Sequence, residues 1–187
     1  MTNAEITALL TRLFGDAAQV VSELAWQVEA GPSRLLVLLS EDASWLRALI
    51  SIAPAKDAEP YLMQLLEANF DATQETRYAL YERVLWGVFQ HDRATLTTED
   101  FERAIARLVQ LQEKGLDDSF SQLAETQIKQ IIAAAKQKGQ SLDDTLQTLE
   151  RFYEEGVMGD LSQDAAQRQS VLDAWRYQLE RLWNTVD

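Results

Sequence analysis

The sequence predicts an α+β protein built on an antiparallel sheet of about five strands, followed by a helical C-terminal part. Residues 1–115 show the order helix, three strands, helix, two strands and helix. Three consecutive strands joined by short turns can pair only as an antiparallel meander, which excludes a doubly wound parallel sheet. After residue 116 every periodic signal is helical. We therefore expect an α+β domain over residues 1–115 and a three-helix extension over residues 116–187 that packs on it.

The first helix and the first strand are predicted from two different hydrophobic periods. Apolar residues recur at spacings of three and four over Asn3–Phe14, behind Thr2 or Asn3 as the cap, which indicates an amphipathic helix. From Val20 to Ala30 apolar and polar residues alternate, a pattern typical of a strand with one buried and one polar face.

The second predicted strand, Arg34–Ser40, is the one whose apolar residues require the most cover from the rest of the fold. The residues Leu35 to Leu39 are all apolar, whereas a strand with one solvated face would alternate. Both faces of this strand must therefore meet apolar groups. A third strand is expected over Trp45–Ala53, after a polar turn.

The remaining elements are predicted from caps, terminators and periodicity, and Thr97 with Asp100 fits a capping box at the start of the third helix. Pro60 is acceptable in the first turn of the second helix, and Gly87 indicates a bulge or a close backbone approach in the last strand. The fourth and fifth strands are adjacent enough that one long bent strand is an alternative. The expected ranges are helix 57–69, strands 76–83 and 84–91, helix 97–115, and C-terminal helices 119–138, 141–156 and 162–185.

Charge and composition argue against several classes of partner. The chain of 187 residues carries 30 acidic and 17 basic side chains, a net charge of −13, and its basic residues form no cluster. Such a surface repels nucleic acid and anionic lipid, so neither is an expected partner. Apolar residues make up 47% of the chain, but no run is long enough to span a bilayer. With no signal-peptide pattern and no cysteine, the cytoplasm is the expected location.

No pattern in the sequence predicts catalysis, a cofactor or a metal site. The single histidine, His91, has no cysteine or second histidine to complete a metal site. Acidic pairs such as Asp117-Asp118 stand at turns or helix ends, where carboxylates cap or are solvated. Neither a phosphate-binding glycine loop nor a nucleophile elbow is present. We expect no catalytic residue, no cofactor and no metal ligand.

The five tryptophans separate into core and surface candidates. Trp26 and Trp175 have the parity or spacing of core positions and are expected inside. Trp45 shares its strand face with Arg47 and Leu49, which makes a mixed surface. The C-terminal helices, a second subunit or a bound peptide could each cover this surface, so Trp45 and Leu49 are candidate protein-binding residues.

The order of elements and two stretches of sequence carry a resemblance to a known family. The stretches are Tyr61-Leu62-Met63-Gln64-Leu65-Leu66-Glu67-Ala68-Asn69-Phe70 and Thr97-Thr98-Glu99-Asp100-Phe101. In these features the chain resembles the class I type III secretion chaperones, which have the Tir-chaperone-like fold. The YbjN-like proteins and an uncharacterised cyanobacterial family share that fold. The resemblance covers residues 1 to about 115.

The resemblance implies a small acidic homodimer without a catalytic site, which holds an unfolded segment of another protein against its sheet and helices. It implies that the second helix and the last strand contribute to dimer contacts and that exposed apolar patches receive the partner. It directs attention to Tyr81, Leu85, Trp86 and Phe89 as protein-binding residues. The helices after residue 116 depart from the family pattern and are candidates to occupy the surface that secretion chaperones leave open.

Two hypotheses about function follow from these observations. The first is a non-enzymatic protein-binding module, either chaperone-like or a regulatory adaptor, that binds another protein or a peptide segment. The alternative is a small-ligand-binding protein or a carboxylate-dependent enzyme, with a cleft between the sheet and the C-terminal helices. A concave pocket with converging acids and a raised carboxylate pKa would favour the alternative.

Overall fold

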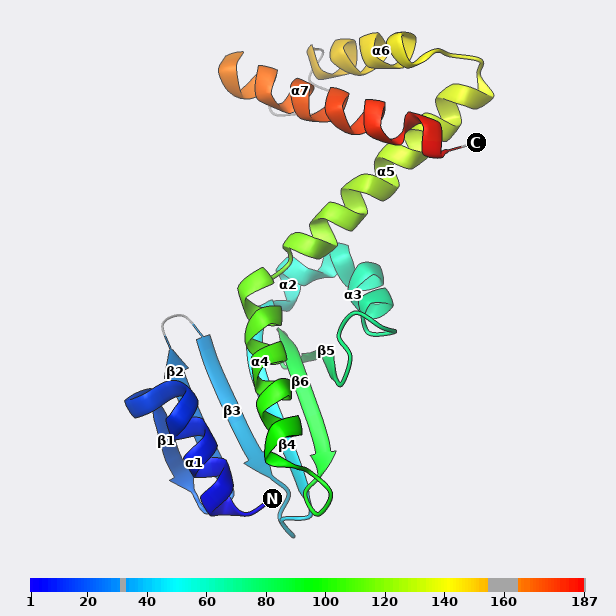
Figure 1. Ribbon diagram of the computed structural model, residues 1–187. Coiled ribbons are helices and arrows are strands. Elements are labelled where there is room, and N and C mark those ends of the chain that lie inside the picture. The colour runs from blue at the N-terminus through cyan, green and yellow to red at the C-terminus, as the bar shows by residue number, and fades with distance from the viewer. Residues whose placement is uncertain (31–32, 155–164, 187) are drawn as a thin grey trace. The chain divides into compact units, whose positions relative to one another are not determined.

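The computed structural model describes residues 1–30, 33–154 and 165–186, and the chain divides into two compact units, Met1–Phe120 and Ser121–Asp187 (Figure 1). The α+β class predicted from the sequence is confirmed. The boundary follows Phe120 rather than residue 115, and α5 (Asp117–Gln137) runs from the first unit into the second. The packing of the C-terminal helices on the first unit stays a prediction. In the described ranges, no helix is both long and apolar enough to cross a lipid bilayer.

The first unit contains a six-stranded sheet in the order β1-β2-β3-β4-β6-β5 (Figure 1). Every neighbouring pair is antiparallel, as the predicted meander requires. The strands are β1 (Ala18–Ser22), β2 (Ala25–Ala30), β3 (Ser33–Leu39), β4 (Trp45–Pro54), β5 (Thr76–Tyr81) and β6 (Val84–Asp92).

The prediction of a single strand over residues 20–30 is wrong, because β1 and β2 form a hairpin there. Ser22 pairs with Ala25 across the turn, and the Ser22 hydroxyl accepts a hydrogen bond from the Leu24 N–H at 3.2 Å. This local bond stabilises a tight turn that has no Gly, Pro or Asn. The sheet therefore has six strands rather than about five.

A two-residue turn separates β5 from β6, so the alternative of one long bent strand is wrong. Glu82 and Arg83 occupy this turn with φ angles of 46° and 65°. Positive φ at both central residues is the geometry that matches the twist of the flanking strands.

The predicted helix over residues 57–69 is interrupted in the structure. It consists of α2 (Ala55–Ala58) and α3 (Leu62–Ala68), joined by a 3-10 turn at Glu59–Tyr61. Because α2 starts at Ala55, Pro60 lies beyond the first turn, where its missing N–H removes a helical hydrogen bond.

The two long helices of the first unit begin at their predicted caps. At α1 (Asn3–Phe14), Thr2 and Glu5 form a capping box. At α4 (Thr98–Lys114), the Thr97 hydroxyl accepts a hydrogen bond from the Asp100 N–H at 3.1 Å. Both helices lie against the same face of the sheet (Figure 1).

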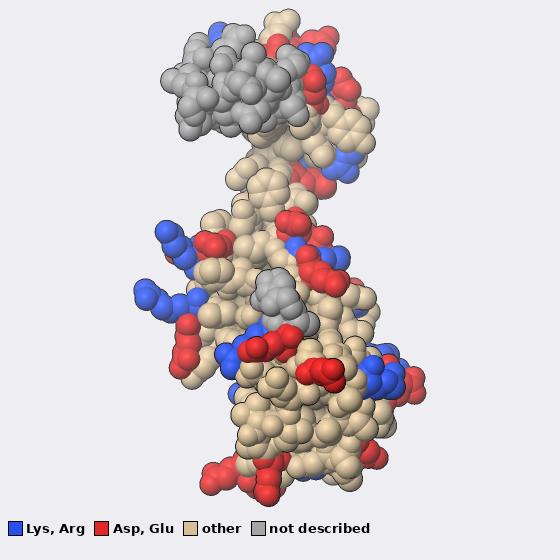
Figure 2. All heavy atoms as spheres, turned by 90° about the vertical axis from the view of Figure 1, so that its left-hand side faces the viewer, with Lys and Arg blue, Asp and Glu red and all other residues tan. Residues whose placement is uncertain are grey.

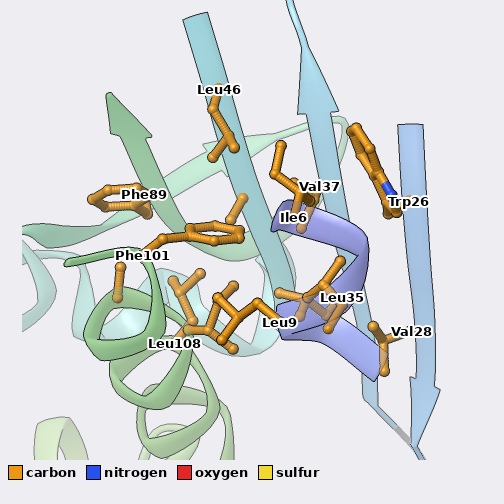
Figure 3. Packing of buried hydrophobic residues seen from close by; sticks show 14 of the residues in the cluster. Ile6, Leu9, Trp26, Val28, Leu35, Val37, Leu46, Phe89, Phe101 and Leu108 are labelled. Atoms are coloured by element: carbon orange, nitrogen blue, oxygen red, sulfur yellow. The ribbon is translucent and has the colours of Figure 1, made fainter. Parts of the chain in front are cut away.

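The core of the first unit lies between these two helices and the strands. Figure 3 shows Ile6 and Leu9 of α1 and Phe101 of α4 directed at side chains of the sheet. Trp26 is 3% exposed, as predicted, and its Nε1–H donates to the Thr7 hydroxyl at 2.8 Å. Buried strand residues of this core are Trp26, Val28, Leu35, Val37, Leu39, Leu46, Ala48, Ile50 and Phe89.

Gly87 lies where the sheet approaches α4 closely, which is one of the two roles predicted for it. A Cβ atom there would lie 3.2 Å from Leu108 Cδ2 and 3.0 Å from Ile50 Cγ2. The bulge in this region lies instead on β4, between Ser51 and Ala53.

The second unit contains most of α5 together with α6 (Leu142–Glu154) and α7 (Ala165–Leu182), and it has its own apolar cluster. Trp175, predicted to be a core residue, packs against this cluster but is only half-buried. The expected helix end at residue 156 and start at residue 162 lie outside the described residues. The buried members of the cluster are Ile128, Ile132, Leu149, Leu179 and Leu182.

Candidate functional site

One face of the sheet is covered by the helices of the first unit, and the other face is not covered by any described helix of that unit. Figure 1 shows α1 and α4 lying across the covered face. Successive residues of a strand point to opposite faces, so the residues between the buried positions point away from the helices. We call this second surface the open face. Its apolar centre consists of Leu36, Leu38, Trp45, Leu49, Trp86 and Val88.

The pairing of the strands brings the apolar residues of the open face into a continuous row. Leu36 of β3 lies opposite Leu49 of β4, and Leu49 lies opposite Val88 of β6. Directly opposed side chains on one face of a sheet contact each other. Arg77 of β5 is opposite Val88 and ends the row at the sheet edge.

Apart from Val88, which is 6% exposed, the apolar centre of the open face is only partly shielded from solvent, in contrast to the covered face. Leu36 and Leu38 are half-buried, whereas Leu35 and Val37 of the same strand are 3% and 0% exposed. We expected apolar groups to cover both sides of β3. Within the first unit, α1 and α4 cover the side of Leu35 and Val37, and no described helix covers the side of Leu36 and Leu38. Leu38 has Arg47 as its opposed neighbour, and the aliphatic stem of such a side chain can shield apolar surface in part.

Three of the six predicted protein-binding residues lie in the apolar centre of the open face. Trp45 is 46% exposed, and Leu49 and Trp86 are half-buried. The Trp86 Nε1–H donates to the Tyr81 carbonyl oxygen at 3.1 Å. Tyr81, the fourth predicted residue, lies at the end of β5 on the same face and is 67% exposed.

Leu85 and Phe89 point to the covered face and do not contribute to this surface. They are 1% and 2% exposed, and the Phe89 ring lies 6.4 Å from the Phe101 ring between centroids. Successive side chains along β6 point to opposite faces of the sheet. Leu85 and Phe89 therefore point toward the helices, whereas Trp86 and Val88 point to the open face.

Sequence reasoning missed the contribution of Leu36, Leu38 and Val88 to the same surface. Counting every second residue from Leu49 would have identified Trp45 and Arg47 as neighbours, but not the residues on adjacent strands. Those depend on the register of β3 and β6 against β4, which the sequence pattern does not contain.

Arginines on the open face are hydrogen-bonded to glutamines. Arg34 Nη2 donates to Gln27 Oε1 at 2.6 Å, and Arg77 Nη2 donates to Gln90 Oε1 at 3.0 Å. Arg47 lies between Leu38 and Gln90 in the pairing of the strands. Within the described ranges, none of these three arginines forms an ion pair.

The Trp45 end of the open face is hollowed. A depression of about 350 Å³ lies there, with a floor and walls made by both apolar and polar residues. The residues that line it are Leu38, Leu39, Ser40, Trp45, Arg47 and Gln90.

A second set of exposed apolar side chains lies on α3, just after it, and at the end of β5. Met63, Leu66 and Phe70 are 65%, 66% and 95% exposed, and Leu80 of β5 is 48% exposed. The end of α3 is joined to β5, because Asn69 accepts from the Tyr78 N–H at 2.7 Å and donates to the Tyr78 carbonyl at 3.1 Å. We call Met63, Leu66, Phe70, Leu80 and Tyr81 the α3–β5 surface.

A hollow of about 590 Å³ beside β6 and α4 is lined by Glu75, His91 and Asp100 together with Arg103 and Arg107, and Arg103 donates to the Asp100 carboxylate there. Serine hydroxyls at positions 40 and 44 hold the pKa of Asp42 at about 2, and Arg12 lowers the pKa of Glu102. All carboxyl groups with a clear shift in these ranges have lowered pKa values, the reverse of what a general acid needs. No group of three or more potential metal ligands occurs in the same ranges. His91 stacks on Phe89, and its Nδ1 lies 2.7 Å from the Asp92 carbonyl oxygen.

Charges of both signs are scattered over the molecule. Figure 2 shows acidic and basic side chains interspersed with uncharged surface on the face that it presents.

Similarity to known proteins is found among solved structures. No family model matches the sequence, and no curated protein matches it. Among the solved structures that match are the HopA1–SchA chaperone–effector complex, the ExsC–ExsE complex, and the heterodimeric ExoU–SpcU complex from the type III secretion system of Pseudomonas aeruginosa. Their sequence identities are 13%, 18% and 14%, and their TM-scores are 0.48, 0.46 and 0.47. The matches cover 61%, 62% and 60% of this chain and 91%, 97% and 95% of the others.

Proposed function

We propose that this protein is a non-enzymatic protein-binding module, chaperone-like or an adaptor, that holds an extended segment of a partner protein on its open face. The observation that carries the proposal is the row of Leu36, Leu49 and Val88, continued by Trp45 and Trp86, on a sheet face without a helical cover from the first unit. Contiguous apolar surface rimmed by polar residues is typical of protein interaction sites. Tryptophan and arginine, both present here, are the residues most enriched at binding hot spots.

A homodimer formed through the α3–β5 surface is part of the proposal. Phe70 is 95% exposed, and an aromatic side chain in that state loses unfavourable contact with water when a second copy covers it. The resemblance to secretion chaperones implies dimer contacts at the second helix, which corresponds to α2 and α3, and at the last strand, which is β6 rather than β5. The two surfaces share Tyr81, but Met63 and Leu66 belong to α3, whereas the apolar centre of the open face comes from β3, β4 and β6.

A location in the cytoplasm is part of the proposal, and a chain without cysteine is compatible with a reducing compartment.

The experiment is photo-crosslinking from the open face. Peptides are selected from a displayed library against the full chain, and a photoreactive amino acid then replaces Trp45 or, as the control, Tyr177 of the second unit, which is 65% exposed. We expect selected peptides to be labelled from position 45 and not from position 177. Equal labelling at the two positions, or a library without any enriched peptide, would refute the proposal.

A pair of matched substitutions tests the same point without a crosslinker. Leu49→Thr removes an apolar group from the open face and is expected to weaken peptide binding several-fold, while Val20→Thr, at an exposed β1 residue that pairs with Trp26 on the opposite face, leaves it unchanged. Thermal melts of both variants show whether the fold is retained.

A further inference from the structure

We infer, on the basis of the proposed function, that the open face selects segments in which an acidic residue stands between two apolar residues at every second position. The partner is thus an extended chain with the pattern apolar-x-acidic-x-apolar. The inference follows from the charges of the open face, their hydrogen-bond partners and their spacing along β4.

The outward strand positions of the open face carry one more basic than acidic side chain, whereas the whole chain is acidic. The chain has 30 acidic and 17 basic side chains. By strand parity, the outward positions of β2 to β6 carry Arg34, Arg47 and Arg77 against Glu29 and the terminal Asp92. A locally basic surface within an acidic molecule is complementary to a locally acidic ligand.

The arginines of the open face keep hydrogen-bonding capacity for a ligand. Within the described ranges, Arg34 and Arg77 donate to glutamine amide oxygens, and Glu29, which accepts from Gln27, lies directly opposite Arg34 on the same face. Each guanidinium has five N–H donors in a planar fork that matches a carboxylate. A carboxylate that replaced or joined the glutamine oxygen would form a stronger, charge-assisted hydrogen bond.

The positions along β4 define the expected pattern of the ligand. Trp45, Arg47 and Leu49 follow one another on the open face, each two residues apart. A segment extended along this strand places every second side chain toward the sheet, at about 6.6 Å intervals. An apolar residue then meets Trp45 and the hollow beside it, an acidic residue meets Arg47, and a second apolar residue meets Leu49.

Charge argues against the two other occupants of this surface. A second copy packed face to face would bring the arginines of both copies into the same interface, where like charges repel. A basic segment would be attracted by the net charge at long range but would meet Arg47 on contact. At physiological salt, screening acts over about 8 Å, so the charges in contact decide which segment is retained.

The test compares three fluorescein-labelled peptides with the full chain by fluorescence anisotropy. The peptides share leucines at alternate positions and differ at the position between them, which is glutamate, glutamine or lysine. We expect the glutamate peptide to bind most tightly and the lysine peptide most weakly. Raising the salt concentration should weaken binding of the glutamate peptide more than that of the glutamine peptide.

Two substitutions assign the preference to the open face. Arg47→Gln should reduce the affinity for the glutamate peptide about two- to fivefold, the range of one exposed ion pair, and leave the glutamine peptide unchanged. Arg107→Gln is the matched control, because Arg107 Nη1 also donates to a glutamine, Gln110 at 3.3 Å, but lies on α4. Equal melting temperatures of both variants exclude a difference in folding.

The outcomes separate the inference from the proposed function. Equal affinity for the three peptides, a preference for lysine, or an unchanged glutamate preference in Arg47→Gln overturns the acidic specificity while photo-crosslinking from position 45 still supports protein binding. Absence of binding by all three peptides also overturns the inference, and absence of crosslinking in addition overturns the proposed function.

Discussion

Gly87→Ala is expected to destabilise the first unit because the space beside Gly87 is already filled. A methyl group at this position would lie 3.0 Å from Ile50 Cγ2, 3.2 Å from Leu108 Cδ2 and 3.5 Å from Ile52 Cδ1. The first two distances are shorter than the 3.5–4.0 Å at which carbon atoms attract each other best. Ile50 and Leu108 are 1% and 0% exposed, so neither can move into solvent.

Two effects of opposite sign determine the magnitude. Overpacking of a filled core costs typically about 1–3 kcal/mol. Replacing glycine by alanine in a strand returns about 0.5–1 kcal/mol, because the unfolded chain loses conformational freedom. The Ile50 methyl is attached directly to Cβ of a central strand and can shift only with the backbone, so the overpacking effect is the larger one. We expect a net loss of about 1–2 kcal/mol in the free energy of unfolding.

Urea denaturation followed by tryptophan fluorescence measures this loss, and a double-mutant cycle tests its cause. With a slope of about 1–3 kcal/mol/M, the midpoint should fall by roughly 0.5–1 M without a change in the slope. Leu108→Ala alone lowers the free energy of unfolding, but it also removes the Leu108 methyl group that would clash with Ala at position 87. The double variant should therefore be more stable than the sum of the single effects predicts. A Gly87→Ala protein as stable as the wild type, or additive effects in the cycle, would refute the packing argument.

Three further predictions concern a cap, a turn and the α3–β5 surface. Thr97→Ala should lower the free energy of unfolding by about 1 kcal/mol, measured by urea titration, because α4 loses its N-cap; a Thr97→Ser protein that is equally destabilised would contradict this. The pKa of Asp42 is lowered to about 2, mainly by the Ser40 hydroxyl, so its contribution to stability is present above the unfolded pKa near 4 and is lost as the pH falls toward 2. The difference in melting temperature between wild type and Asp42→Asn should therefore shrink between pH 5 and pH 2, and a constant difference would argue against the turn geometry. Phe70→Ser should shift the chain from dimer to monomer in sedimentation velocity with unchanged circular dichroism, and a wild-type protein that sediments as a monomer would remove the proposed dimer.

Local signals in the sequence were sufficient for the helices that begin at strong caps. Thr2 with Glu5 and Thr97 with Asp100 satisfy the first N–H groups of α1 and α4 from within four residues of chain. Such interactions form wherever the segment folds as a helix, which is why the predicted starts agree with the structure. The same reasoning failed for the helix around Pro60, where the outcome depended on the exact residue at which α2 starts.

The hairpin of β1 and β2 shows the limit of turn signals. Its turn is stabilised by a hydrogen bond from the Leu24 backbone N–H to the Ser22 hydroxyl. It contains no glycine, proline or asparagine, the residue types that usually indicate a turn. Hydrophobic alternation continues through the turn, so the pattern of residues 20–30 is compatible with one long strand. Pairing with β3, through contacts such as Trp26 with Val37, accompanies the turn in the folded sheet.

The sequence by itself determined the class of fold, the caps of its long helices and the unusual demand of the apolar run in β3, because each of these depends on neighbours in the chain. Tertiary structure alone decided which residues share the open face. Leu49 and Val88 are far apart in sequence and meet through strand register, while Leu85 and Phe89, close to Trp86 in sequence, point into the core. A surface formed by several strands exists only after the strands are paired, since pairing sets both the neighbours and the direction of every side chain.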